Sequence, residues 1–539
     1  MQLNQKELPK VTNNYFRNQQ AFTTFLVLSF FVLSLIGILN HEMWRDETQA
    51  WLIARDSLTL SDLYENLKFE GHPALWHLCL FIITKFTHNP FAMQFFHILI
   101  ATAIVWIFVK LSPFNILQKA LFTFSYFPFF EYNLISRNYS LGLLFVFIFC
   151  YLFTSKKRNY ILLFSSLALL ANTNVYGLLI CLCSSATLII DTIRIYRIDK
   201  SQLNRKQIKN LKMGLIVLFL GIGLSLFQLA PLAIQDTAKD INDNIGEIGE
   251  ETVVSKFDFL LTMLRRLGYS LRAIWYSYIP IPNFFEYHFW SQNLVSISSF
   301  LILLSSFASL FLLIFSIILF LDKPIVLFLY LSGNFTIILF TWLKWQGTLR
   351  HHGNLFILFL ACIWISKFSE KAYDVPRSLQ KISAYFKKFQ KKIITAILLI
   401  QMVSGLYAYS MDLIYPFSKS RIAANFIKKE QLSEKFIIGD RDTIISPISA
   451  YLDKKIYYVA YDQLGSFFNN PQIKFIKNQS QLINKVNRVI KEGSRENILI
   501  LGYPLNIKSD QLNITLIGEF SKSIVAEEQY YIYLVEKNK

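Results

Sequence analysis

The chain has 539 residues, of which 53% are hydrophobic, and its mean hydropathy is +0.38. Soluble domains rarely reach such values, so the composition excludes an ordinary soluble enzyme and predicts a polytopic α-helical membrane protein. The formal net charge of +18 would also suit a nucleic-acid partner, but the basic residues lie in short segments between apolar runs. The positive-inside rule explains that placement, and no nucleic-acid partner is expected.

The N-terminal segment 1–20 is polar and basic, and an apolar run follows at 21–40. No small-residue cleavage site comes after it, so we predict an uncleaved signal anchor with a cytoplasmic N-terminus. Further apolar stretches lie at 74–87, 91–109, 115–131, 139–154, 159–171, 175–193, 213–234, 294–321, 325–343, 354–366 and 393–410.

Lysine and arginine cluster in three segments, which are 156–158, 194–212 and 367–392. All three are expected on the cytoplasmic side with the N-terminus, so an even number of crossings must precede the first. The weakest candidate there is 74–87, which is short and carries His77 and Lys85. We expect it to lie in the outer interface, which leaves about 11 transmembrane helices, with 12–13 as the alternative. Segments 41–90 and 235–293 then become outer loops.

The second outer loop, 235–293, has two halves. Its first half, 236–251, is acidic and contains glycine, which predicts a mobile segment. The second half, 257–278, has the pattern of an amphipathic helix with three arginines. Such a helix would lie on the membrane surface or cover a site as a lid.

The sequence changes character after the multi-span module 21–410. Strands are predicted at 436–440, 456–460, 497–502, 514–520 and 530–536, with helices at 421–434 and 479–492. Segment 411–539 is therefore expected to be a small extracytoplasmic α/β domain. No glycine-rich phosphate loop follows a strand, so no nucleotide is expected.

Two adjacent carboxylates, Asp46 and Glu47, directly follow the first apolar run. Such a pair at the mouth of a membrane span is costly without a role. One carboxylate can act as general base while the second holds a cation or a hydroxyl. The alternative is a helix cap, with Asp46 only starting a short helix over 47–56. The flanking Trp44 and Arg45 favour a site that binds substrate.

Two further polar groups are predicted on the same face of the membrane. Glycine and proline flank His72, so a rigid turn presents its imidazole close to Glu70. Arg137 lies at membrane depth and needs an anionic partner. That partner is either a protein carboxylate, Glu131 or Asp46, or a lipid phosphate held by two parallel hydrogen bonds.

A third polar group, Arg350, His351 and His352, lies between two predicted spans. Snorkelling explains a single lysine at such a place but not three donors in a row, so an anion or metal role is favoured. Basic donors and carboxylates on one face suit attack on the anomeric carbon of a sugar carried by a polyprenyl phosphate. Arg137, Arg350 and His351 would then bind the donor phosphate.

Three motifs carry a resemblance to a known family. They are Trp44-Arg45-Asp46-Glu47, Gly71-His72-Pro73-Ala74-Leu75-Trp76 and Ser136-Arg137-Asn138-Tyr139-Ser140-Leu141. The chain resembles the membrane-embedded glycosyltransferases of the C-type fold, near the protein O-mannosyltransferase and aminoarabinose-transferase branch. The resemblance covers the first ~155 residues well and the rest only in architecture. Many relatives have two prolines where this chain has Pro73-Ala74, and the Arg350-His351-His352 group has no certain equivalent.

The resemblance implies an inverting transfer from a polyprenyl-phosphate sugar to a lipid, glycan or protein acceptor, with Asp46 as base and Glu47 in support. Some members bind a divalent cation, so Mg, Mn or Zn held by Glu70 and His72 is one expectation and no metal is the other. The residues expected to contact substrate are Trp44, Arg45, His72, Tyr139 and His352.

Two other functional classes stay open at this level. A transporter or flippase of lipid-linked glycans should carry ionisable groups in the middle of several spans, whereas here they gather at one face. A scaffold or receptor whose outer domain binds a partner would not need Asp46. The cysteine-free outer domain favours a bacterial plasma membrane.

Overall fold

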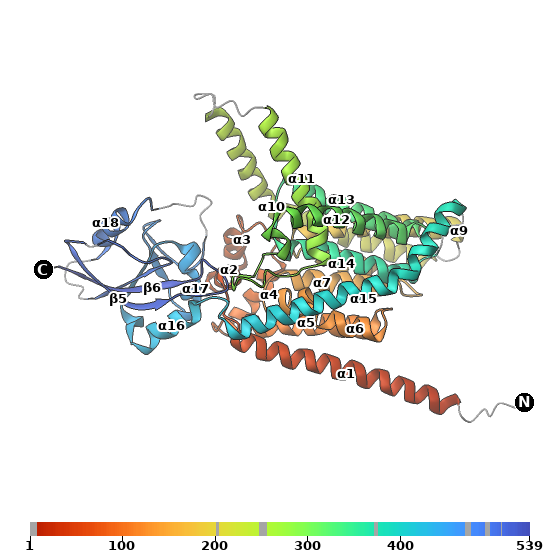
Figure 1. Ribbon diagram of the computed structural model, residues 1–539, viewed down its shortest axis with the longest axis horizontal. Coiled ribbons are helices and arrows are strands. Elements are labelled where there is room, and N and C mark those ends of the chain that lie inside the picture. Colours follow the sequence, from red (N-terminus) through yellow and green to blue (C-terminus); the bar gives the residue numbers. More distant parts are fainter. Residues whose placement is uncertain are drawn as a thin grey trace, which may run out of the picture.

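The computed structural model describes residues 8–200, 204–246, 256–370, 376–468, 476–490, 496–507 and 509–538. A helical module comes first and a small α/β domain follows it, at one end of the bundle (Figure 1). The helices of the module are α1 (Leu8–Asn40), α2 (Arg45–Asp56), α3 (Leu60–Asn66), α4 (Leu75–Thr84), α5 (Phe91–Leu111), α6 (Ile116–Thr123), the π-helix η1 (Tyr126–Glu131), α7 (Tyr139–Phe153), α8 (Tyr160–Ala171), α9 (Val175–Ile198), α10 (Arg205–Gly246), α11 (Lys256–Tyr278), the 3-10 helix η4 (Leu294–Ile297), α12 (Ser299–Phe320), α13 (Pro324–Leu343), α14 (Leu349–Ser366) and α15 (Arg377–Ile414).

Eight helices of the described chain are long and apolar enough to cross a membrane. They are Gln19–Asn40, Phe91–Leu111, Val175–Ile198, Arg205–Pro231, Ser299–Phe320, Pro324–Leu343, Leu349–Ser366 and Ser378–Ile414. This confirms the expected polytopic helical architecture. α4 has 10 residues, a length of about 15 Å, which is half the hydrocarbon thickness of a bilayer. It is too short to cross alone, while the full number of crossings stays a prediction.

The expected outer loop 235–293 is largely helical. α10 continues unbroken to Gly246, since neither glycine nor proline interrupts the sequence after Pro231. The prediction of a loop over 236–246 was therefore wrong, and 247–251 lie outside the described residues. α11 returns beside α10, and both project from the bundle (Figure 1). Towards its end, α11 buries Ala273, Ile274 and Tyr278 against α12, α13 and α14. That half is packed against the bundle, and its expected place on the membrane surface or as a lid stays a prediction.

The α/β domain contains a six-stranded sheet in the order β3-β2-β1-β4-β6-β5. β1 pairs in parallel with β2 and β4, and the other pairs are antiparallel. The elements are α16 (Ser420–Lys429), η5 (Leu432–Glu434), β1 (Phe436–Gly439), α17 (Asp442–Leu452), β2 (Ile456–Tyr458), β3 (Gln463–Gly465), α18 (Gln479–Val489), β4 (Asn497–Leu501), β5 (Leu512–Phe520) and β6 (Tyr530–Lys537).

Alternation along the strands gives this sheet two apolar faces. Ile437 of β1 joins the core formed with α16 and α17, and its neighbour Ile438 joins the core formed with α18. The five predicted strands are confirmed. α17 was missed because Pro447 in the sequence argues against a helix there. α17 packs on α2, so the domain rests on the helix that carries Asp46 in its first turn.

Candidate active site

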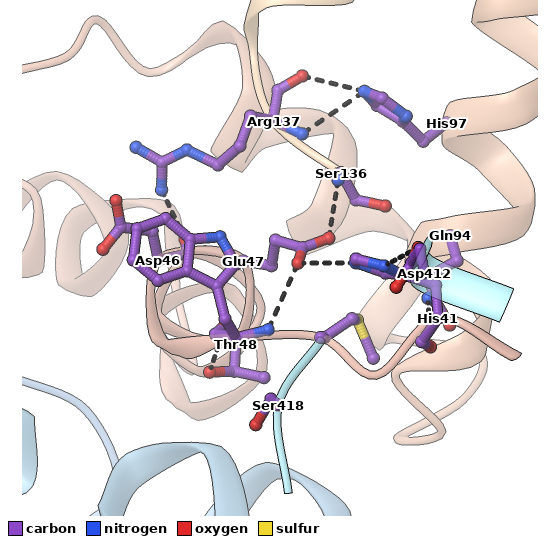
Figure 2. Close-up of polar contacts among 12 residues, drawn as sticks. His41, Asp46, Glu47, Thr48, Gln94, His97, Ser136, Arg137, Asp412 and Ser418 are labelled. Carbon is purple, nitrogen blue, oxygen red and sulfur yellow. Dashed lines mark hydrogen bonds and ion pairs between the residues drawn. The ribbon is translucent and has the colours of Figure 1, made fainter. Parts of the chain in front are cut away.

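Glu47, in the first turn of α2, is buried and forms a row of charged groups with His41 and Asp412. Its side chain is 0% exposed, and Oε1 accepts a hydrogen bond from the Ser136 amide at 2.6 Å. Its Oε2 accepts from the Trp44 amide at 3.2 Å and lies 3.1 Å from His41 Nε2. His41 Nδ1 in turn lies 2.7 Å from Asp412 Oδ2 at the end of α15 (Figure 2). Glu47 therefore holds the first loop in place and caps α2, which is a role that the sequence analysis had considered for Asp46.

The His41 imidazole is enclosed between two carboxylates. Burial disfavours the charged form, but Asp412 and Glu47 outweigh it and raise the pKa of His41 from 6.5 to about 10. The imidazolium therefore persists at neutral pH and bridges two acids that would otherwise repel each other.

This raised pKa predicts how stability depends on pH. A group whose pKa is higher in the folded chain contributes stability that is fully present below its unfolded pKa and is lost as the pH rises through the folded value. For His41 that window runs from 6.5 to about 10. We expect the unfolding temperature of the detergent-solubilised protein to fall steadily across it. A flat or rising profile between these pH values would contradict the bridging imidazolium.

Asp46 points to the other side of α2 from Glu47 (Figure 2). Its side chain is 28% exposed, and Oδ2 accepts a hydrogen bond from Arg350 Nη2 at 3.0 Å. Burial raises the pKa of Asp46, but the cations of Arg350, Arg137 and Arg45 lower it below its usual range overall. Asp46 is thus an ionised and accessible carboxylate, with Oδ1 3.9 Å from Arg45 Nε. An ionised and accessible carboxylate can accept a proton, although the lowered pKa makes Asp46 a weak base while the three cations are in place.

Arg350 is held by two indole rings. Its guanidinium carbon lies 5.1 Å from the ring centre of Trp44 and 5.6 Å from that of Trp290. Trp290 donates from Nε1 to Glu131 Oε2 at 3.1 Å. Only Nη2 of Arg350 meets a carboxylate, while the buried Nε and Nη1 have no hydrogen-bond partner.

Arg137 has no carboxylate partner within the described part of the chain. Its Nη1 donates to the backbone carbonyl of Asp46, and its Nη2 lies 3.3 Å from His72 Nε2. His97 of α5 fixes the backbone, since its Nε2 accepts from the Arg137 amide at 3.3 Å. The side chain is only 9% exposed, and its Nε has no partner. Arg137 is close enough to Asp46 to lower its pKa but makes no direct ion pair with it, so its unpaired nitrogen can hold a further anion.

Unused donors gather around Asp46. Buried polar atoms normally find hydrogen-bond partners, so several unpaired ones in one place indicate a ligand. The unpaired atoms are Trp44 Nε1, His72 Nδ1, Arg137 Nε, the Tyr139 hydroxyl and Arg350 Nε and Nη1. With the exception of the hydroxyl, they are nitrogens suited to phosphate or sugar oxygens.

The turn at Gly71 brings His72 to this cluster. Gly71 has φ 69°, a left-handed conformation that favours glycine. Burial, and then the nearby Arg137 charge, lower the pKa of His72 to about 3, so its imidazole is neutral. A guanidinium can only donate, so Nε2 accepts from Arg137 and Nδ1 carries the proton. His72 thereby offers one free N–H to a ligand.

The two residues predicted to hold a metal, Glu70 and His72, already have partners within the protein. Glu70 Oε1 accepts from Gln49 Nε2 at 2.7 Å, and His72 Nε2 faces a guanidinium. Among the residues that the structure describes, no group of three or more His, Cys, Asp or Glu side chains could hold a metal ion. Metal binding by Glu70 and His72 stays a prediction, and no chemical step below depends on it.

His351 and His352 do not reach Asp46 as Arg350 does. His351 caps α14, since its Nδ1 accepts from the Thr348 amide at 2.9 Å, and its ring centre lies 5.6 Å from that of Tyr139. His352 Nε2 lies 2.9 Å from the Gln346 carbonyl, and its Nδ1 is unpaired. The predicted phosphate contact of His351 and substrate contact of His352 stay predictions.

Arg45 faces the α/β domain. Its Nη1 pairs with Glu527 at 2.7 Å, and 37% of its side chain is exposed.

Three residues of the site, His41, Asp412 and Trp290, were given no role from the sequence. An acid at the end of the last span, such as Asp412, is the one sequence signal that could have indicated a partner for His41.

No family model matches the chain, and no curated protein matches it. Among solved structures, it is similar to the crystal structure of ArnT from Cupriavidus metallidurans bound to undecaprenyl phosphate. The sequence identity is 9%, the match covers 95% of this chain and 98% of that chain, and the TM-score is 0.41. Likeness at this level assigns no residue roles, which rest on the geometry of this chain.

Proposed function

We propose that the chain is a membrane glycosyltransferase that moves a sugar from a polyprenyl-phosphate carrier to an acceptor, with inversion at the anomeric carbon. The observation that carries this proposal is an ionised, partly exposed Asp46 next to Arg137, a buried arginine with no carboxylate partner in the described chain. A base and an unfilled anion site side by side suit the attack of a hydroxyl on a carbon that bears a phosphate.

In the proposed reaction, Asp46 accepts the proton of the acceptor hydroxyl. Arg350 donates a hydrogen bond to Oδ2, so the proton would go to Oδ1, whose nearest cation, Arg45 Nε, is 3.9 Å away and beyond hydrogen-bond distance. The acceptor oxygen then forms a bond to the anomeric carbon while the bond between that carbon and the phosphate oxygen breaks. The electron pair of the broken bond remains on the phosphate, where Arg137 compensates the charge through Nε, which has no partner in the structure. Transfer at the outer face of the membrane stays a prediction, and the sugar and the acceptor stay open.

Transfer is tested with a polyprenyl-phosphate sugar that carries an isotope label in the sugar. In proteoliposomes, the proposal expects the label to appear on an acceptor and the carrier to be released as free polyprenyl phosphate. Passage of the intact labelled lipid across the bilayer, without cleavage of the sugar–phosphate bond, would instead identify a transporter.

Replacing Arg137 by Ala is expected to weaken binding of polyprenyl phosphate by roughly 10- to 100-fold, the usual effect of losing hydrogen bonds to a charged group. Arg350→Ala should weaken it less, because Arg350 already has Asp46 as its partner. Binding of a neutral sugar analogue should change little in either variant. Titration of the purified protein with the lipid measures this.

A matched control for these variants is Arg194→Ala. Arg194 is an arginine of α9 that pairs with the exposed Glu370, away from the donor cluster. It should bind polyprenyl phosphate like the unaltered protein. Unchanged lipid affinity in Arg137→Ala would show that this arginine is structural.

A further inference from the structure

The α/β domain holds the backbone that leads into Asp46. The Met43 amide donates to the Tyr451 hydroxyl at 3.0 Å, and the Met43 carbonyl accepts from Ser420 Oγ at 3.2 Å. Glu42 Oε2 accepts from the amides of Arg421 at 3.1 Å and Ile422 at 3.4 Å, at the start of α16. The mechanism proposed above uses none of these contacts.

The contact closest to Asp46 comes from Glu528. The amide of Arg45, the first residue of α2, donates to Glu528 Oε1 at 3.0 Å across 483 positions of sequence. The first amides of any helix have no acceptor within the helix. Here the α/β domain supplies one, directly before the residue proposed as the base.

Glu528 is itself rigidly held. It is 1% exposed, and its Oε2 accepts from Ser418 Oγ at 2.9 Å and from the Tyr530 hydroxyl at 2.7 Å. The side chain of the neighbouring Glu527 is 68% exposed and pairs with the Arg45 guanidinium. Two adjacent glutamates thus reach the same arginine, one through its backbone amide and one through its side chain.

We infer that Glu528 is a positioning residue for Asp46, so that the α/β domain belongs to the catalytic unit of the enzyme. By fixing the first turn of α2, Glu528 keeps the Asp46 carboxylate in contact with Arg350. It also keeps the backbone carbonyl of Asp46 in contact with Arg137. The inference rests on the proposed function, since it matters for turnover only if Asp46 is the base. A displacement of about 1 Å at a reacting group is enough to cost up to 10²-fold in rate.

The test compares Glu528→Ala with Glu527→Ala in the full-length protein, with a labelled polyprenyl-phosphate sugar as donor. We expect kcat to fall roughly 10- to 100-fold in Glu528→Ala, with the KM for the donor changed by no more than about twofold. Glu527→Ala should keep kcat within about twofold of the unaltered protein. Glu528→Gln retains an oxygen for the Arg45 amide and should recover most of the lost kcat.

Should Glu528→Ala fail to fold, Tyr451→Phe tests the same clamp by removing only the hydroxyl that accepts from Met43. A lower kcat at unchanged KM supports the inference, and an unaltered kcat in the folded variant overturns it. Equal losses of kcat in Glu528→Ala and Glu527→Ala also overturn it.

Asp46→Asn, measured in parallel, separates a failure of the proposed function from a failure of the inference about Glu528. Full turnover in that variant refutes the proposed function, whereas an inactive Asp46→Asn beside a fully active Glu528→Ala refutes this inference alone.

Discussion

Asp46→Asn is expected to lower turnover by about 10²- to 10⁴-fold, the usual contribution of a general base. The Asn side chain has nearly the same shape as Asp, and its carbonyl oxygen can still accept the hydrogen bond from Arg350. It cannot take up a proton from the acceptor. Because the two side chains are nearly isosteric and Asn keeps the hydrogen bond from Arg350, stability should change much less than turnover. Turnover of labelled donor and the unfolding temperature in detergent measure the two effects separately.

Asp62→Asn is a suitable control for that variant. Asp62 is also an aspartate in the first turn of a helix of the same loop, but it is exposed and only completes the cap of α3 with Thr59. Its replacement should leave turnover unchanged. If Asp46→Asn turns over as fast as Asp62→Asn, Asp46 is not the base.

The predicted convergence of distant polar groups could be derived from the sequence because it depends on only a few physical rules. Charged side chains avoid the hydrocarbon, and basic loops fix the side of each span. These rules place Asp46, Arg137 and Arg350 at the same end of the bundle, and the structure brings all three into contact.

The division of roles between Asp46 and Glu47 could not be predicted in the same way. Consecutive helical residues point about 100° apart, so at most one of them faces a given side. Which one is exposed depends on the positions of Ser136, His41 and Arg350, and the sequence does not supply these. The same limit applied to the Arg350-His351-His352 run, where only the first side chain reaches Asp46.

The fold was predictable where turn-forming residues mark the ends of strands and helices. The alternating strands bounded by turns in the α/β domain were found, and α4 is as short as its sequence suggested. The continuation of α10 was missed because the acidic residues suggested a loop, although no glycine or proline interrupts the segment before Gly246. Contacts such as His41 with Asp412, 371 positions apart, arise from tertiary packing and have no local signal.

Glu47→Ala is expected to have the opposite effect to Asp46→Asn, a large loss of stability. Removing this buried carboxylate leaves the imidazolium of His41 and the amides of Ser136 and Trp44 without their acceptor. Loss of one partner of a buried ion pair costs about 3–5 kcal/mol. Thermal unfolding in detergent should show it, while Glu65→Ala, which removes an exposed partner of Lys68, should change stability by no more than about 0.5 kcal/mol.

The His41→Ala variant decides whether Glu47 acts through the charged chain or only through backbone amides. His41→Ala leaves Glu47 and Asp412 as two buried acids without the cation between them. If Asp412, His41 and Glu47 act as one unit, the variant that combines His41→Ala with Glu47→Ala should lose much less stability than the sum of the two single losses. The losses of free energy at neighbouring residues that share a partner do not add. Strict additivity would mean that His41 and Glu47 stabilise the loop independently, and that the Asp412–His41–Glu47 chain does not hold α2 in place as a unit.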